Sequence, residues 1–131
     1  MKVLIAEDDF ASRKFMLRFF EKYGECDVTV DGREAVEAYT MAVEMDEPYD
    51  LICLDIMMPG TDGIEALYRI RESEKRLKIP EDKCPKIIMV SALSDMNYVD
   101  GAFELGCDGY ANKPLDTDKM EEVLRKLELI K

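Results

Sequence analysis

The sequence predicts an α/β fold of three layers, in which a doubly wound, mostly parallel sheet of five strands carries helices on both faces. Continuous apolar runs, such as residues 3–6, 51–54 and 87–90, suit strands that are covered on both sides. Segments with the helical spacing of apolar residues alternate with these runs, which is typical of repeated strand–helix units. Right-handed crossovers then put helices on both faces, and the 131 residues are about half of what a β/α barrel needs.

The first half of the chain predicts three strands and two helices. Asp9 is placed to cap a first helix that ends near Gly24. Residues 26–30 then alternate as an edge strand does, and the turn at Asp31 and Gly32 opens a second helix. The apolar residues that these helices should direct at the core are Phe15, Met16, Phe19, Phe20, Ala35, Val36, Tyr39 and Met45.

The second half of the chain predicts three helices and two strands. Turn-forming residues at 59–63 precede the third helix, and a long polar segment, residues 71–86, separates that helix from the next strand. We expect this segment to be a solvated loop, with a partner contact as the alternative. Ser94 or Asp95 is placed to cap a fourth helix, which ends at Gly106. The apolar residues expected to face the core are Ile64, Leu67, Tyr68, Met96, Val99, Phe103, Met120, Val123, Leu124 and Leu127.

The composition describes a single acidic domain. The 131 residues, 47% of them hydrophobic, fit one domain of common size, and the formal net charge of -11 disfavours binding to nucleic acid or to anionic membranes. No apolar stretch approaches the roughly 20 residues of a membrane helix, and the first apolar run meets Glu7 too early for a signal peptide. We therefore expect a cytoplasmic domain without nucleic-acid or membrane partners.

The four cysteines do not predict a metal site. They lack the paired C-x-x-C spacing of zinc sites, and the chain has no histidine. We expect all four to be reduced and Cys53, inside an apolar run, to be part of the core.

Polar side chains follow four of the predicted strands. Glu7 and Asp8 come after the run at 3–6, and Asp55 comes after the run at 51–54. In open parallel sheets ligands bind beyond the carboxyl ends of the strands, so these acids converge if the two strands are neighbours. Ser91 and Lys113, which follow the predicted strands at 87–90 and 109–112, bring a hydroxyl and a cation to the same end of the sheet.

This combination of groups predicts phosphoryl chemistry. Clustered carboxylates repel one another, so they must protonate, pair with a cation or bind a metal. Mg²⁺ prefers oxygen ligands and leaves positions for phosphate oxygens. The metal, the Lys113 ammonium and the Ser91 hydroxyl can each contact one phosphoryl oxygen, and Asp55 is the plausible nucleophile because carboxylates form acyl phosphates in known mechanisms.

In order and spacing these residues resemble the receiver domain of bacterial two-component response regulators, the CheY-like family. The resemblance rests on Glu7-Asp8 after the first strand, the stretch 55–63, Ser91-Ala92 and the stretch 106–114, and it spans essentially the whole chain. It implies the strand order 2-1-3-4-5 and a flavodoxin-like arrangement. Residues 1–131 are then expected to be a single receiver domain without an output domain.

The resemblance also implies roles for individual residues. Asp55 would receive the phosphoryl group from a sensor histidine kinase or a histidine phosphotransfer protein, and Lys113 would bind a phosphoryl oxygen. Glu7, Asp8 and Asp55 would bind Mg²⁺ together with the Met57 carbonyl, with Asp8 as the more direct ligand than Glu7. The peptide bond between Lys113 and Pro114 is expected to be cis.

A switch is implied as well, with Ser91 moving toward the phosphoryl group and the Tyr110 ring rotating into the space it vacates. The expected readout surface for a downstream protein is the face formed by residues 95–129. Met57 and Leu93, which stand two residues after Asp55 and Ser91, cannot orient a hydrolytic water, and this predicts a long-lived acyl phosphate.

Several alternatives remain open at the level of sequence. The domain is expected either to act on a target protein or to serve as a phosphorelay intermediate, as a monomer or a weak homodimer. A phosphatase with an aspartate nucleophile normally has a second Asp two residues after the first, where this chain has Met57. A phosphorylation-independent interaction module of the same shape is the third possibility.

Overall fold

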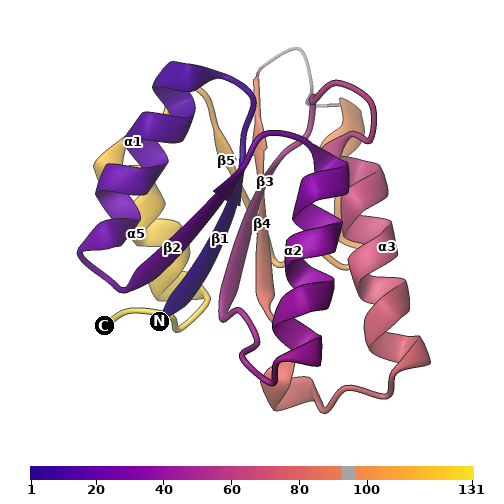
Figure 1. Cartoon of the computed structure of the whole chain (residues 1–131). Coiled ribbons are helices and arrows are strands. Elements are labelled where there is room, and N and C mark those ends of the chain that lie inside the picture. Colours follow the sequence, from indigo (N-terminus) through magenta and orange to yellow (C-terminus); the bar gives the residue numbers. More distant parts are fainter. Residues whose placement is uncertain (93–96) are drawn as a thin grey trace.

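The structure is a computed structural model that describes residues 1–92 and 97–131, and it consists of one sheet with helices on both sides (Figure 1). The elements in chain order are β1 (Lys2–Ala6), α1 (Phe10–Glu21), β2 (Glu25–Thr29), α2 (Gly32–Glu44), β3 (Leu51–Asp55), α3 (Gly63–Arg76), the short 3₁₀ helix η1 (Glu81–Lys83), β4 (Lys86–Ser91), α4 (Val99–Leu105), β5 (Gly109–Asn112) and α5 (Thr117–Lys126).

The sheet is parallel, with the strand order β2-β1-β3-β4-β5. This confirms the predicted doubly wound fold and its order. At the carboxyl end Ala6 pairs with Leu54, and Ser91 pairs with Asn112. The register therefore brings the polar residues that follow β1, β3, β4 and β5 to one edge of the sheet.

Two apolar cores lie on the two faces of the sheet. Helices α1 and α5 cover one face, and α2, α3 and α4 cover the other (Figure 1). Every residue of β3 is buried, including Cys53, because both of its faces are covered. All four cysteines are free, as expected from the sequence.

Aspartates cap four of the helices at their N-termini. The side chains of Asp9, Asp31, Asp62 and Asp116 each accept a hydrogen bond from a backbone N–H of the first turn. Each such cap contributes about 1 kcal/mol. The predicted cap at Asp9 is confirmed, and the predicted turn at Asp31 and Gly32 does open α2. The predicted cap at Ser94 or Asp95, with the core position at Met96, lies outside the described residues.

Helix α3 is longer than the sequence pattern predicts. It continues to Arg76, so the first part of the segment 71–86 is helical and the prediction of a loop throughout is wrong. Within this part of the helix, the Arg71 side chain is only 15% exposed and forms ion pairs with Glu74 and Asp108. A polar residue that turns toward the protein interior has no signature in a pattern based on apolar spacing.

Three apolar residues predicted for the core are exposed instead: Met45, Tyr68 and Phe103. Met45 is the C-cap residue beyond the last turn of α2, and Tyr68 lies beside the buried stripe of α3. Phe103 is on the outer side of the short helix α4, where its ring contacts Tyr110. Within the described residues, no helix combines the length and the apolar character needed to span a bilayer.

Candidate functional site

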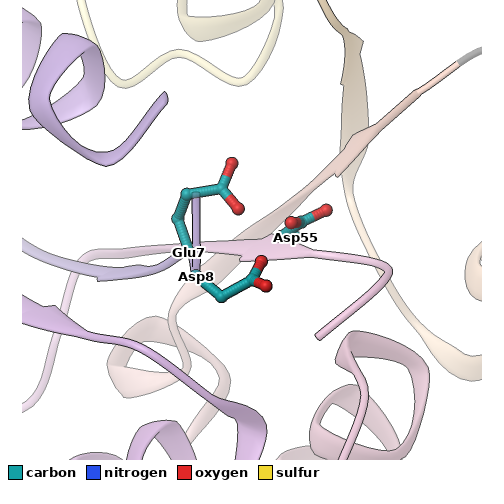
Figure 2. A group of neighbouring side chains, drawn as sticks. All are labelled: Glu7, Asp8 and Asp55. Atoms are coloured by element: carbon teal, nitrogen blue, oxygen red, sulfur yellow. The ribbon is translucent and has the colours of Figure 1, made fainter. Parts of the chain in front are cut away.

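Three carboxylates meet at the carboxyl ends of the parallel strands, which we call the carboxyl edge of the sheet (Figure 2). Glu7 and Asp8 follow β1 directly, and Asp55 is the last residue of the neighbouring strand β3. One carboxylate oxygen from each residue lies within 4.8 Å of the others. The convergence predicted from the ends of the two apolar runs is therefore confirmed.

The loop after β1 holds the acidic pair in a fixed position. Arg13 donates hydrogen bonds from Nη1 to the carbonyls of Glu7, at 3.0 Å, and Asp8, at 3.2 Å. The Glu7 N–H donates to the Thr29 carbonyl on β2 at 3.1 Å. In this arrangement Glu7 is fully buried and Asp55 nearly so, whereas Asp8 is exposed.

Lys113 supplies the positive charge of the site. It follows β5, and its side chain reaches past the end of β4 so that Nζ lies 2.8 Å from Glu7 Oε1 and 3.2 Å from Asp55 Oδ2. Nζ donates a hydrogen bond to the Asp55 oxygen. The contact with Glu7 Oε1 is an ion pair without hydrogen-bond geometry, so that buried oxygen has no hydrogen-bond donor among the described residues. The peptide bond between Lys113 and Pro114 is cis, as the resemblance implied.

The electrostatics of the pocket reflect its excess of acid. Burial, together with the hydrogen bond and the negative charge of Glu7, raises the pKa of Asp55 to about 8, although Lys113 acts in the opposite direction. Burial alone would lower the pKa of Lys113, but its contacts with Glu7 and Asp55 outweigh that effect and raise it. One ammonium thus faces three carboxylates, so the site carries an excess of negative charge.

The donor set of this pocket fits a hard divalent cation. All the converging groups are carboxylate oxygens, which Mg²⁺ prefers, and the buried Glu7 Oε1 accepts no hydrogen bond among the described residues. Glu7, Asp8 and Asp55 are the residues that would hold such an ion. Met57 lies in the loop after β3 with its side chain half exposed, and the role of its carbonyl stays a prediction.

Ser91 ends β4 and is completely buried. Its hydroxyl donates a hydrogen bond to Asn112 Oδ1 at 3.0 Å, and its carbonyl accepts one from the Lys113 N–H at 2.7 Å. No role is predicted for Asn112 from the sequence. Its contact depends on the pairing of Ser91 with Asn112 across β4 and β5, and a strand register of that kind is not visible in one sequence.

Tyr110 is on β5, two residues before Asn112, and its side chain is partly exposed. Its ring packs edge to face on Phe103 of α4, with 6.1 Å between centroids and 87° between planes. In this structure the Tyr110 ring is partly exposed at the protein surface. The movement predicted for Ser91 and Tyr110 stays a prediction. Leu93 lies outside the described residues.

The comparisons with known proteins identify the class. A family model described as the response regulator receiver domain matches residues 3–125, and the chain belongs to that family. It is thus a receiver domain of two-component systems, and the family is one of signalling domains. Chemotaxis protein CheY of Treponema pallidum is 37% identical over 123 residues, which are 92% of this chain and 78% of that protein.

Solved structures give the same picture. The CheX–CheY complex of Borrelia burgdorferi, with BeF₃ and Mg²⁺, contains a chain that matches with a TM-score of 0.81 and 30% identity, over 100% of this chain and 90% of that one. The complex of the Saccharomyces cerevisiae histidine phosphotransfer protein Ypd1 with the receiver domain of Ssk1 matches with a TM-score of 0.77 and 25% identity, over 95% of this chain and 86% of that one.

Some relatives are much longer than this chain. It spans 48% of the transcriptional regulatory protein ResD of Bacillus subtilis, to which it is 36% identical over 132 aligned positions. The match to such proteins concerns the part that the chain covers.

Proposed function

We propose that this domain is a phosphoacceptor switch that takes a phosphoryl group on Asp55 from a phosphohistidine. The observation that carries the proposal is the position of Asp55, a buried carboxylate at the end of β3 with Lys113 on one side and Glu7 and Asp8 close by. The donor is a sensor histidine kinase or a histidine phosphotransfer protein. The Ypd1 complex, in which a receiver domain is bound to a phosphotransfer protein, supports the second kind of donor.

The transfer is a displacement at phosphorus. An oxygen of the ionised Asp55 carboxylate forms the new O–P bond while the N–P bond of the phosphohistidine breaks, and the electron pair stays on the imidazole nitrogen. Lys113 Nζ, which already donates to Asp55, is placed to donate to a phosphoryl oxygen. The Lys113 ammonium would then stabilise the negative charge on the equatorial phosphoryl oxygens in the transition state. Positioning and electrostatic stabilisation of this kind are the main contributions that a protein makes to phosphoryl transfer.

Mg²⁺ is the cofactor of the proposed reaction. It would be held by Glu7, Asp8 and Asp55 with the Met57 carbonyl, and when bound it neutralises the negative charge that three carboxylates and a phosphoryl group bring together. The matched CheX–CheY structure contains Mg²⁺ and BeF₃, which supports this assignment. The domain acts catalytically only on its own phosphorylation and dephosphorylation.

The output of the switch is a change in the surface formed by residues 95–129. A phosphoryl group adds charge and strong acceptors, and the Ser91 hydroxyl and the Tyr110 ring are the groups proposed to respond to it. The partner on this surface is a downstream protein. CheX in the matched complex is an example of a protein bound by a CheY chain. Residues 1–131 are proposed to act as one receiver domain.

Intact mass spectrometry tests the proposal. The domain is incubated with Mg²⁺ and acetyl phosphate, beside the variants Asp55→Asn and Asp9→Asn. The proposal predicts one phosphoryl adduct on the wild type and on Asp9→Asn, because an asparagine side chain can still cap α1, and none on Asp55→Asn. A wild type without an adduct would contradict phosphoacceptor function and favour a phosphorylation-independent module.

A further inference from the structure

The Ser91 hydroxyl already has a partner in this structure. Ser91 is fully buried, and a buried hydroxyl without a hydrogen bond would be costly, so the Asn112 side chain satisfies it at 3.0 Å. The two residues pair in register at the ends of β4 and β5, which places both side chains on the same face of the sheet. The contact is therefore set by the strand register.

A serine hydroxyl has one proton, so it can donate only one full hydrogen bond at a time. In this structure the donation goes to Asn112 Oδ1. To donate to a phosphoryl oxygen on Asp55, Ser91 must first give up that bond. Asn112 and the phosphoryl group are thus competing acceptors for the same proton.

We propose that Asn112 is a positioning residue that holds the Ser91 hydroxyl in the unphosphorylated state and releases it when Asp55 is phosphorylated. This inference rests on the proposed function, because it requires a phosphoryl group on Asp55. By stabilising the unphosphorylated state, Asn112 opposes the switch without itself contacting the reacting atoms.

The surrounding backbone confines the change to side chains. The Lys113 N–H donates to the Ser91 carbonyl at 2.7 Å, which fixes the end of β5 to the end of β4 whichever way the hydroxyl points. Asn112 is only half-buried, so its amide oxygen can turn to water after the release. Hydrogen bonds to charged acceptors are stronger than bonds between neutral groups, which gives the exchange its direction.

The expected size of the effect follows from one neutral hydrogen bond. Removing the competing acceptor should tighten the binding of a phosphoryl mimic by about 2- to 10-fold. The binding of Mg²⁺ alone should not change, because Ser91 is not among the carboxylates that would hold the ion. A purely structural role of Asn112 would instead weaken the binding of both.

A double-mutant cycle tests the inference. The dissociation constants of beryllium fluoride in saturating Mg²⁺, and of Mg²⁺ alone, are measured by calorimetry for the wild type, Asn112→Val, Ser91→Ala and the double variant. We expect Asn112→Val to bind beryllium fluoride about 2- to 10-fold more tightly than the wild type, and to make no difference in the Ser91→Ala background. Asn112→Ala serves as a second variant if the valine does not fit.

Tyr49→Phe is the matched control, since it also removes one side-chain hydrogen bond, from Tyr49 before β3 to Asp27 in the middle of β2, away from Ser91 and Asn112. It should leave the affinity for beryllium fluoride unchanged. Equal effects of the Asn112 substitutions in both backgrounds, or weaker binding, would overturn the inference while leaving phosphoacceptor function intact. A wild type that neither binds beryllium fluoride nor forms the acetyl phosphate adduct would overturn both.

Discussion

Two clusters of charged side chains lie at opposite edges of the same sheet, and they differ in how their charges are compensated. At the carboxyl edge, Glu7, Asp8 and Asp55 share one ammonium, and a buried oxygen of Glu7 lacks a hydrogen-bond donor among the described residues. At the amino ends of the strands, which we call the amino edge, Arg71 lies between Glu74 and Asp108. The first cluster has three carboxylates and one ammonium. In the second cluster, which we call the closed network, the Arg71 guanidinium forms an ion pair with both carboxylates.

The amino-edge cluster uses all three nitrogens of the Arg71 guanidinium. Nε donates to the Gly106 carbonyl at 2.9 Å, Nη1 to both oxygens of Glu74 and to the Pro85 carbonyl, and Nη2 to Asp108 Oδ2. The same Asp108 oxygen accepts the Ile87 N–H at 2.8 Å. One side chain on α3 thus ties together the starts of β4 and β5 and the end of α4.

The difference in charge compensation between the two clusters distinguishes buried charges that stabilise a fold from buried charges that suit the binding of a ligand. A closed network is expected to stabilise the fold and to have no effect on binding. A cluster with excess negative charge and a carboxyl of raised pKa is held at a cost to the fold, and binding of a cation should relieve that cost. Substitutions at the two edges should therefore change stability in opposite directions.

The largest expected effect is at the amino edge. Arg71→Met leaves Glu74, whose side chain is 9% exposed, buried without its cation, and this should destabilise the domain by about 3 to 5 kcal/mol. Thermal denaturation should show a melting temperature lower by about 10 °C or more. Arg69→Met, which breaks an exposed pair with Glu65, should change stability by less than about 1 kcal/mol. A loss for Arg71→Met no greater than that of Arg69→Met would break the comparison.

The opposite sign is expected at the carboxyl edge. Asp55→Asn should stabilise the domain by about 1 to 3 kcal/mol in Mg²⁺-free buffer at pH 8 or above, because it removes a buried charge. The pKa of Asp55 rises from 3.8 to about 8 on folding, so the folded state binds the extra proton between those values and wild-type stability falls as the pH rises through them. The gain should therefore shrink toward pH 4.

Denaturant titration at several pH values, with and without Mg²⁺, measures this gain. Saturating Mg²⁺ should reduce it, since the ion compensates the charge in the wild type. Glu122→Gln, which removes an exposed acid paired with Lys126, should show little change at any pH. A variant Asp55→Asn that is less stable than the wild type at pH 8 would contradict the account of the pocket.

The smallest expected effect concerns the water that hydrolyses the acyl phosphate. The half-exposed Met57 side chain cannot hydrogen-bond to a water that attacks the acyl phosphate. Met57→Asn provides one such bond and should speed dephosphorylation by about fivefold, the rate equivalent of about 1 kcal/mol. The decay of the phosphoryl adduct by mass spectrometry measures the rate, with Met41→Asn on the exposed side of α2 as control. Equal decay of both variants and the wild type would refute the role of Met57.

Sequence could predict the carboxyl edge because its residues come directly after buried strands. Glu7, Asp8, Asp55, Ser91 and Lys113 all follow apolar runs or strand-like segments, and parallel strands bring such positions together. The amino-edge cluster could not be predicted in the same way. It joins residues of α3 to the turn before β5, 37 positions apart in sequence, and depends on how a helix packs across the sheet.

Asn112 shows a second limit of sequence reasoning. Its position at the end of a predicted strand was visible, but its partner was not, because the contact with Ser91 requires the register between β4 and β5. Phe103 shows a third. Apolar spacing assigned it to the core, whereas α4 buries Val99 and Ala102, and the Phe103 ring contacts Tyr110 at the surface instead.

The most direct test of the central claim is the chemical identity of the phosphorylated residue. The domain is phosphorylated with acetyl phosphate and Mg²⁺ and then treated with hydroxylamine, which converts an acyl phosphate to a hydroxamate, and its peptides are mapped by mass spectrometry. We predict a hydroxamate at residue 55 and at no other acid. A hydroxamate at Asp8 or another carboxylate, or a phosphoryl adduct that resists hydroxylamine, would contradict the assignment of Asp55 as the phosphoacceptor.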